Sequence, residues 1–174
     1  SGVASVVIAG TNSVELPGGM WVSNALNKSV QAVTPGADWV TPPVPVEYGV
    51  NPVYVQGLDA TGGLHSDIVG ITREPVTPAN VAASDGTFTN RIQITWGASA
   101  GSAAYALYRN TTNVFETASA VAMSITNLYY NDTPATPGKR YYYWVRAQQN
   151  GAWSQVSAGD SGYSKLGACN VTAT

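Results

Sequence analysis

The sequence predicts an all-β fold made of two tandem β-sandwich domains. Composition is the first reason, because only 10% of the 174 residues are charged while 18 glycines and 10 prolines supply turns. The second is a series of short runs rich in β-branched and aromatic residues, without apolar spacing of helical period. The third is residues 136–147, where a Pro-Gly turn precedes a long alternating strand.

That alternation divides the predicted strand into two faces. One face carries Tyr141, Tyr143, Val145 and Ala147, and the other carries Tyr142, Trp144 and Arg146. It is a long strand rich in aromatic residues and entered from a tight turn, so we arrange the second half of the chain around it.

Residues 1–75 form the first predicted domain. Its expected strands are residues 3–8, 14–16, 20–22, 30–33, 44–46, 52–60 and 68–72. Proline interrupts 44–46, which places that piece at a sheet edge, and residues 61–63 form a hairpin turn. We expect Val53 and Val55 to point inward. About seven short strands without helical pattern indicate a small β-sandwich.

The first domain resembles bacterial immunoglobulin-like repeats from large secreted proteins. The residues that carry the resemblance are Trp39, Val44, Val46, Gly49, Asn51, Val53, Val55, Asp59, Gly62, Ile71 and Arg73. It implies an immunoglobulin-like sandwich.

A stiff linker, Glu74-Pro-Val-Thr-Pro78, leads to the second predicted domain, residues 76–164. An edge strand is expected over 78–84, and residues 152–163 are expected to close the sheet. Alternation places five side chains inward, namely Ile92, Ile94, Trp96, Tyr105 and Leu107.

The motifs Ile94-Thr-Trp96, Tyr105-Ala-Leu-Tyr-Arg-Asn110, the stretch 137–147 and Asp160-Ser-Gly-Tyr163 resemble a fibronectin type III domain. The resemblance implies that Trp96 is the core tryptophan. It also implies that Tyr141 is the corner tyrosine, whose hydroxyl bonds back to the backbone. The chain has no Arg-Gly-Asp tripeptide, so integrin-type adhesion is not implied.

Charge and hydropathy exclude several classes of function. A net charge of −2 and a pI near 5.1 argue against a nucleic-acid surface, and no apolar run approaches the ~20 residues of a membrane span. The start lacks Met and a basic segment, so we expect a mature or excised piece. Cys169 is the single cysteine, which rules out an internal disulfide. Low charge favours an extracellular or cell-surface location.

No catalytic, cofactor or metal site is expected. Gly159-Asp-Ser-Gly162 mimics the surroundings of a serine nucleophile, but the only histidine, His65, falls in the other domain. His65 with Asp67 is too sparse for a transition-metal site, and Asp59 with Asp67 is too sparse for calcium. The chain is therefore predicted not to be an enzyme.

Three aromatic residues, Tyr142, Trp144 and Trp153, are expected to face outward or to lie at a sheet edge. Such residues bind sugar rings or a neighbouring protein surface; alternatively, they pair across strands or cover the joint between the domains. Asn27, Asn110, Asn131 and Asn170 begin Asn-X-Ser/Thr triplets, which are glycosylation sites only in a host with that machinery.

The tail, residues 165–174, carries one charge and no proline, with Leu166 and Val171 as apolar contacts. It is either a free strand that joins a neighbouring chain or a linker. We therefore predict a non-enzymatic extracellular structural protein, the repeating subunit of a surface filament or stalk, whose partners are copies of itself. The alternative is an accessory or carbohydrate-binding module of a larger secreted glycosidase, with polysaccharide as the partner.

Overall fold

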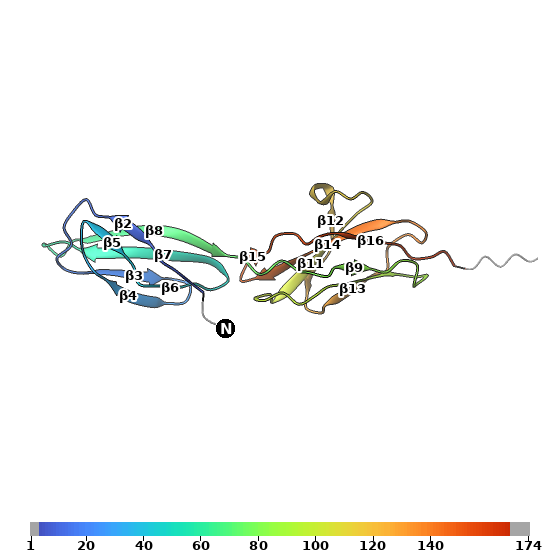
Figure 1. The fold of residues 1–174 in the computed structure, drawn as a ribbon, viewed down its shortest axis with the longest axis horizontal. Helices are drawn as coiled ribbons and strands as arrows, with labels where there is room; N and C mark the ends of the chain where they lie inside the picture. The colour runs from blue at the N-terminus through green and yellow to red at the C-terminus, as the bar shows by residue number, and fades with distance from the viewer. Residues whose placement is uncertain (1–3, 168–174) are drawn as a thin grey trace, which may run out of the picture. The chain divides into compact units, whose positions relative to one another are not determined.

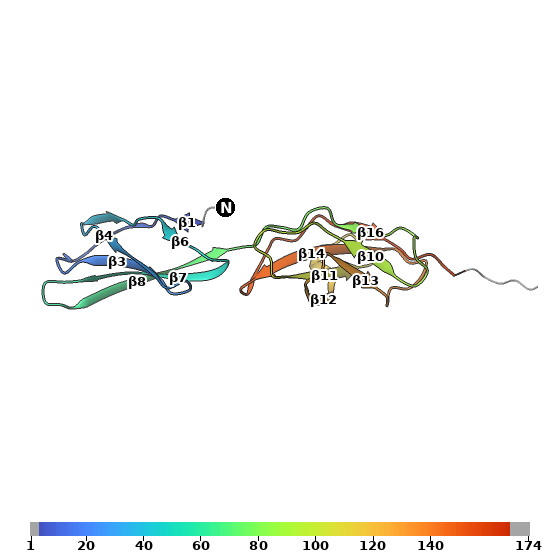
Figure 2. The same ribbon diagram turned by 90° about the horizontal axis from the view of Figure 1, so that it is seen from below.

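The computed structural model describes residues 4–167 of the chain. Contacts divide it into two compact units, and the boundary between them lies between Arg73 and Glu74. Each unit consists of sheets packed face to face, so the fold is all-β with two tandem sandwiches, as predicted (Figures 1 and 2). Within the described residues no helix has the length and apolar character that crossing a membrane requires.

The larger sheet of the first unit has the order β4-β3-β7-β8. Its strands are β3 (Met20–Asn24), β4 (Ser29–Val33), β7 (Gly49–Leu58) and β8 (Leu64–Arg73). β7 and β8 form a hairpin in which Leu58 opposes Leu64 and Gly49 opposes Arg73, without a bulge. The turn at residues 61–63 is the predicted one, and Gly62 has the positive φ of 83° that favours glycine.

A smaller layer covers one face of that sheet. It consists of two antiparallel pairs: β1 (Ser5–Val6) with β6 (Val44–Pro45), and β2 (Ala9–Thr11) with β5 (Asp38–Val40). Its apolar side chains pack against Val22, Val53 and Val55 of the large sheet, which places Val53 and Val55 inward as predicted. Figure 2 shows the short strands lying over β3 and β7.

Three strand predictions for this unit were wrong in extent. Residues 14–16 form no strand, because the chain turns at Pro17-Gly18 and Leu16 is buried from a loop instead. Of the first predicted strand, 3–8, only β1 is observed, and β2, which follows it, was not predicted. The last predicted strand, 68–72, is instead the ten-residue β8, since the hairpin register continues to Leu64.

The second unit has one sheet of order β13-β10-β9 and one of order β12-β11-β14-β15, with β16 also paired to β14. The strands are β9 (Ala82–Ala83), β10 (Ile92–Thr95), β11 (Ala104–Asn110), β12 (Ser119–Ile125), β13 (Tyr129–Asp132), β14 (Tyr141–Gln149), β15 (Ala152–Trp153) and β16 (Asp160–Gly162). A 3-10 helix, η1 (Phe115–Thr117), lies between β11 and β12. β14 lies inside its sheet, between β11 and the strands β15 and β16.

The core of the second unit contains all five side chains that alternation placed inward, Ile92, Ile94, Trp96, Tyr105 and Leu107. Tyr141 is a corner tyrosine, because its hydroxyl accepts from the Thr136 backbone N–H at 3.4 Å and donates to Thr136 Oγ1 at 3.3 Å. The edge strand expected over 78–84 is shorter, only β9. Before β9, the Ala79 carbonyl accepts a single hydrogen bond from the Gly97 N–H at 2.8 Å.

Candidate functional site

The aromatic surface predicted on β14 is largely covered. Trp144 points away from the core, as expected for its face of β14, but it is only 5% exposed and is not accessible to a ligand. The ring of Phe115 from η1 lies 6.0 Å from it, edge-on, and the backbone at Gly159 passes directly over its indole. Tyr142 is half-buried and stacks on Trp144 with ring centroids 6.5 Å apart. Trp144 is therefore outward on its strand but enclosed by η1 and the segment at Gly159.

The remaining predicted contact residues have different surroundings. Trp153 is half-buried, with the Arg146 guanidinium 5.7 Å from its ring centroid. Leu166 is 69% exposed, which makes it the most accessible of these apolar residues. Val171, Asn170 and Cys169 lie outside the described residues.

Three of the four glycosylation triplets are described, and all three asparagines are half-buried. The Asn27 Nδ2 donates to the Pro45 carbonyl at 2.9 Å. The Asn110 Nδ2 donates to the Val114 carbonyl at 2.7 Å and to Thr117 Oγ1 at 2.8 Å. Glycan attachment replaces a hydrogen of that same nitrogen, so it would disturb both loops. Asn131 accepts a hydrogen bond from Gln93 at 3.3 Å.

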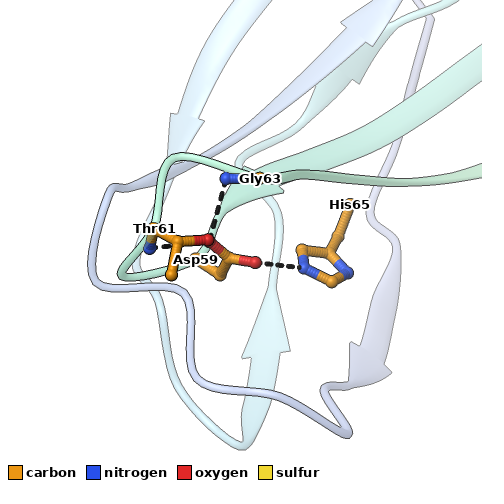
Figure 3. A network of polar contacts seen from close by, with 4 residues as sticks. All are labelled: Asp59, Thr61, Gly63 and His65. Atoms are coloured by element: carbon orange, nitrogen blue, oxygen red, sulfur yellow. Dashed lines mark hydrogen bonds and ion pairs between the residues drawn. The ribbon is translucent and has the colours of Figure 1, made fainter.

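His65 and Ser161 lie in different units, and each is engaged locally. Ser161 Oγ accepts from Arg140 at 2.8 Å. His65 Nε2 lies 3.0 Å from Asp59 Oδ2 at the β7–β8 turn (Figure 3). A serine nucleophile needs a histidine base next to it. The second unit has no histidine, because His65 is the only one in the chain.

Asp59 organises the β7–β8 turn rather than a reactive centre. Besides His65, its carboxylate accepts from the Thr61 N–H, the Thr61 hydroxyl and the Gly63 N–H at 2.7–2.8 Å (Figure 3). The His65 hydrogen bond, followed by those from Thr61 and Gly63, holds the pKa of Asp59 well below its ordinary value. Among residues 4–167 no three His, Cys, Asp or Glu side chains cluster as metal ligands.

The open edge of β8 is the most unusual surface of the molecule. β8 pairs with β7 on one side, and no described residue pairs with it on the other. It is ten residues long and regular, and Leu64, Ile68 and Val69 on it are exposed. The unit's other edge, β4, has half that length. Edge strands are normally blunted by proline, charge or bulges, and residues 68–72 have none of these.

A groove of about 410 Å³ runs between β8 and β2. Its wall on one side is Ile8–Thr11, and its wall on the other is Asp67–Val69. Trp39 and Val55 from the core line it between these walls. The groove continues past Thr11 toward His65, where Met20 and Leu16 also line it. Sequence reasoning missed it, because it arises from the distance between two layers rather than from any one motif.

Comparison with known proteins is limited to structures, since no family model and no curated protein matches the chain. A Fn3-like protein from Clostridium thermocellum is 31% identical over 55% of this chain and 100% of that one, with a TM-score of 0.48. Titin domains A168–A170 are 17% identical over 94% and 59%, with a TM-score of 0.47. Pectate lyase PelI from Erwinia chrysanthemi is 20% identical over 51% and 27%, with a TM-score of 0.41. Over about half of its length, this chain is thus similar to a Fn3-like protein.

Proposed function

We propose that this chain is a non-enzymatic structural protein of the cell exterior, the repeating subunit of a filament or stalk whose copies are joined by β-strand contacts. The observation that carries the proposal is the long, exposed and uninterrupted edge of β8. Unpaired N–H and C=O groups on such an edge add a further strand readily, because each new backbone bond contributes roughly 0.5–1.5 kcal/mol.

Comparison with the other edges supports the choice of β8. β12 is also poor in charge, but its pairing with β11 shifts register twice, and such irregularity blunts an edge. β4 and β13 are five and four residues long. β8 therefore offers the longest regular ladder for an incoming chain.

The tail is the segment that we expect to supply the joining strand. It has no proline, one charge and small or β-branched side chains after Leu166. Leu166 is exposed, and the Lys165 N–H donates to the Phe88 carbonyl at 2.9 Å, which anchors the start of the tail on its own unit.

Electron microscopy of the purified chain and of a variant that lacks residues 166–174 tests the proposal. The truncation keeps the Lys165–Phe88 bond, so both units should stay folded by circular dichroism. We expect polymers from the full chain and none from the variant. Polymers of equal length from both would show that the tail does not join the copies.

The alternative, a carbohydrate-binding module of a larger secreted glycosidase, has weaker support. Stacking on a sugar ring needs an exposed aromatic face, and the enclosure of Trp144 removes the largest predicted one. Retardation of the full chain in polysaccharide gels, without polymers in the microscope, would favour this function instead.

A further inference from the structure

We propose that the groove between β2 and β8 is the acceptor for the tail of a second copy, which enters beside Asp67 and runs antiparallel to β2. This inference rests on the proposed function, because it names where the joining strand binds. It is drawn from four features: a strand that residues 4–167 do not supply to the first unit, the free backbone of β2, the lining of the groove, and its charge.

The second unit shows what fills the corresponding position. There β9 and the residues after it lie between the two sheets: the Ala83 N–H donates to Asp160 Oδ2 at 2.8 Å, and the Tyr163 N–H donates to the Ser84 carbonyl at 3.1 Å. β9 also pairs with β10. One short strand thus closes the edge of that sandwich.

The first unit has no equivalent of β9 within residues 4–167. In its smaller layer β1 and β2 follow one another opposite β6 and β5, so that layer is two strands wide, against three in the second unit. The larger sheets of the two units correspond. Each runs from a hairpin, β4-β3 or β12-β11, to a long strand, β7 or β14. Beyond that long strand lies β8 in the first unit, and β15 and β16 in the second. The groove lies where the missing strand would be.

The backbone of β2 is available for that strand. The Asn12 N–H donates to the Ala37 carbonyl and the Ile8 carbonyl accepts from the Thr41 N–H, so residues 8, 10 and 12 face β5. Antiparallel pairing alternates, and therefore the N–H and C=O groups of Ala9 and Thr11 point toward the groove. Among the described residues β2 pairs with β5 alone.

The groove suits a strand with small apolar side chains. Trp39 is fixed there by a 3.0 Å hydrogen bond from its Nε1 to Asn12 Oδ1, and its ring lies against the backbone of Gly10. Val55 and Val69 complete an apolar lining. The tail alternates Gly167, Cys169, Val171 and Ala173 on one face, which are small enough to face that lining.

Charge sets the direction of the incoming strand. Asp67 is an exposed carboxylate on the β8 wall, and Lys165 is the only charged residue of the tail. β2 and β8 run in opposite directions along the groove, with Thr11 near His65 and Asp67 and Ile8 near Val69. A tail that enters at Asp67 is therefore antiparallel to β2 and parallel to β8. The segment that begins with β9 has the same two orientations, since β9 is antiparallel to β10 and Asp85, two residues after it, forms a parallel bridge with Tyr163.

Disulfide trapping in the full chain tests the inference, because Cys169 is the only native cysteine. Thr11→Cys and Val69→Cys place a second thiol on each wall, and Val30→Cys is the control on the exposed β4 edge. After mild oxidation we expect cross-linked oligomers, seen on non-reducing gels, at least about fivefold more abundant in a wall variant than in the control. Adding Cys169→Ser should abolish them.

A charge exchange gives a second readout that does not depend on thiol geometry. Asp67→Lys and Lys165→Asp should each weaken association about two- to fivefold in sedimentation, the range of an exposed ion pair, and the double variant should restore it. Wall variants that cross-link no more than Val30→Cys, together with no rescue in the double variant, would overturn the inference. If the wall variants do not cross-link but still form polymers, the proposed function stands and only the acceptor groove is wrong. If they cross-link into pairs without forming polymers, the acceptor groove stands and the filament function is wrong.

Discussion

Trp96 is the residue on which the core of the second unit most depends. It packs against Tyr105 with ring centroids 5.6 Å apart and is 5% exposed. Trp96→Ala should lower the free energy of unfolding by about 3–5 kcal/mol, because the cavity cannot refill. Chemical denaturation measures this, with the more exposed Tyr129→Ala as the control. A loss below about 1 kcal/mol would contradict the core position.

Asp132 forms a polar centre within that core. It is fully buried, and its Oδ2 accepts from Arg109 at 2.7 Å and from the Tyr143 hydroxyl at 2.8 Å. Burial, followed by the Asp132 hydrogen bond, raises the pKa of Tyr143 above its ordinary range.

Asp132→Ala should destabilise the second unit by about 3–5 kcal/mol, because it leaves a half-buried guanidinium without its partner. Asp132→Asn keeps the shape and one hydrogen-bond acceptor, so it should cost less. Thermal unfolding of the two variants gives the comparison; equal, small losses in both would mean that the ion pair contributes little.

Asp59 gives the first unit a pH dependence. A carboxylate whose pKa is lowered by folding stabilises the fold above its ordinary value of 3.8, and this stability is lost as pH falls through the lowered pKa. Asp59→Asn should therefore reduce the melting temperature near neutral pH and have a smaller effect in strong acid. A difference between variant and parent that does not change with pH would contradict the role of the carboxylate.

The sequence predicted residues better where one strand determines their surroundings. Trp96 was placed correctly because strand alternation acts locally, and the corner position of Tyr141 was implied by the resemblance to a fibronectin type III domain. The enclosure of Trp144 was not predicted, because η1 and the segment at Gly159, which enclose it, lie outside its own strand. The polar group formed by Arg109, Asp132 and Tyr143 was not predicted for the same reason, since its members come from three strands, β11, β13 and β14.

At the scale of elements, strands with strong alternation were recovered and weakly patterned ones were not. β10 and β14 have clean two-residue periods, whereas 14–16 has β-branched character but only one side chain to bury, Leu16. The full length of β8 was not predicted, because its residues are mostly exposed and pairing with β7, not burial, maintains it. Burial pattern is the only signal that a single sequence offers.

The open edge of β8 makes a specific prediction. Ile68→Lys places a charge on the edge strand and should suppress polymerisation while changing the free energy of unfolding by less than about 0.5 kcal/mol. Val50→Lys is the matched control, since Val50 is 58% exposed, against 56% for Ile68, but lies on β7, an inner strand of the sheet. Electron microscopy counts polymers in each; suppression by both variants alike would point to general charge repulsion rather than to the edge.

At the scale of the whole molecule, the two units share one architecture with one difference. Each has a large sheet built around a long central strand, β7 or β14, and a smaller layer over it. The second unit closes its smaller layer with β9, and the first leaves a groove. The resemblance to a fibronectin type III domain implied the sandwich architecture of the second unit, and no sequence motif indicated the groove of the first.

The chain as a whole is expected to lack hydrolase activity, because the groups that such chemistry requires are assigned elsewhere. A serine nucleophile needs a base, a group that orients the base, and donors for an oxyanion. The single histidine braces a hairpin turn through Asp59, and Ser161 lies in β16 with its Oγ bonded to Arg140. His65→Ala and Ser161→Ala should therefore leave polymer formation unchanged, and a serine-directed covalent probe should not label the parent chain. Labelling of Ser161 that disappears in Ser161→Ala would overturn this and require a base other than histidine.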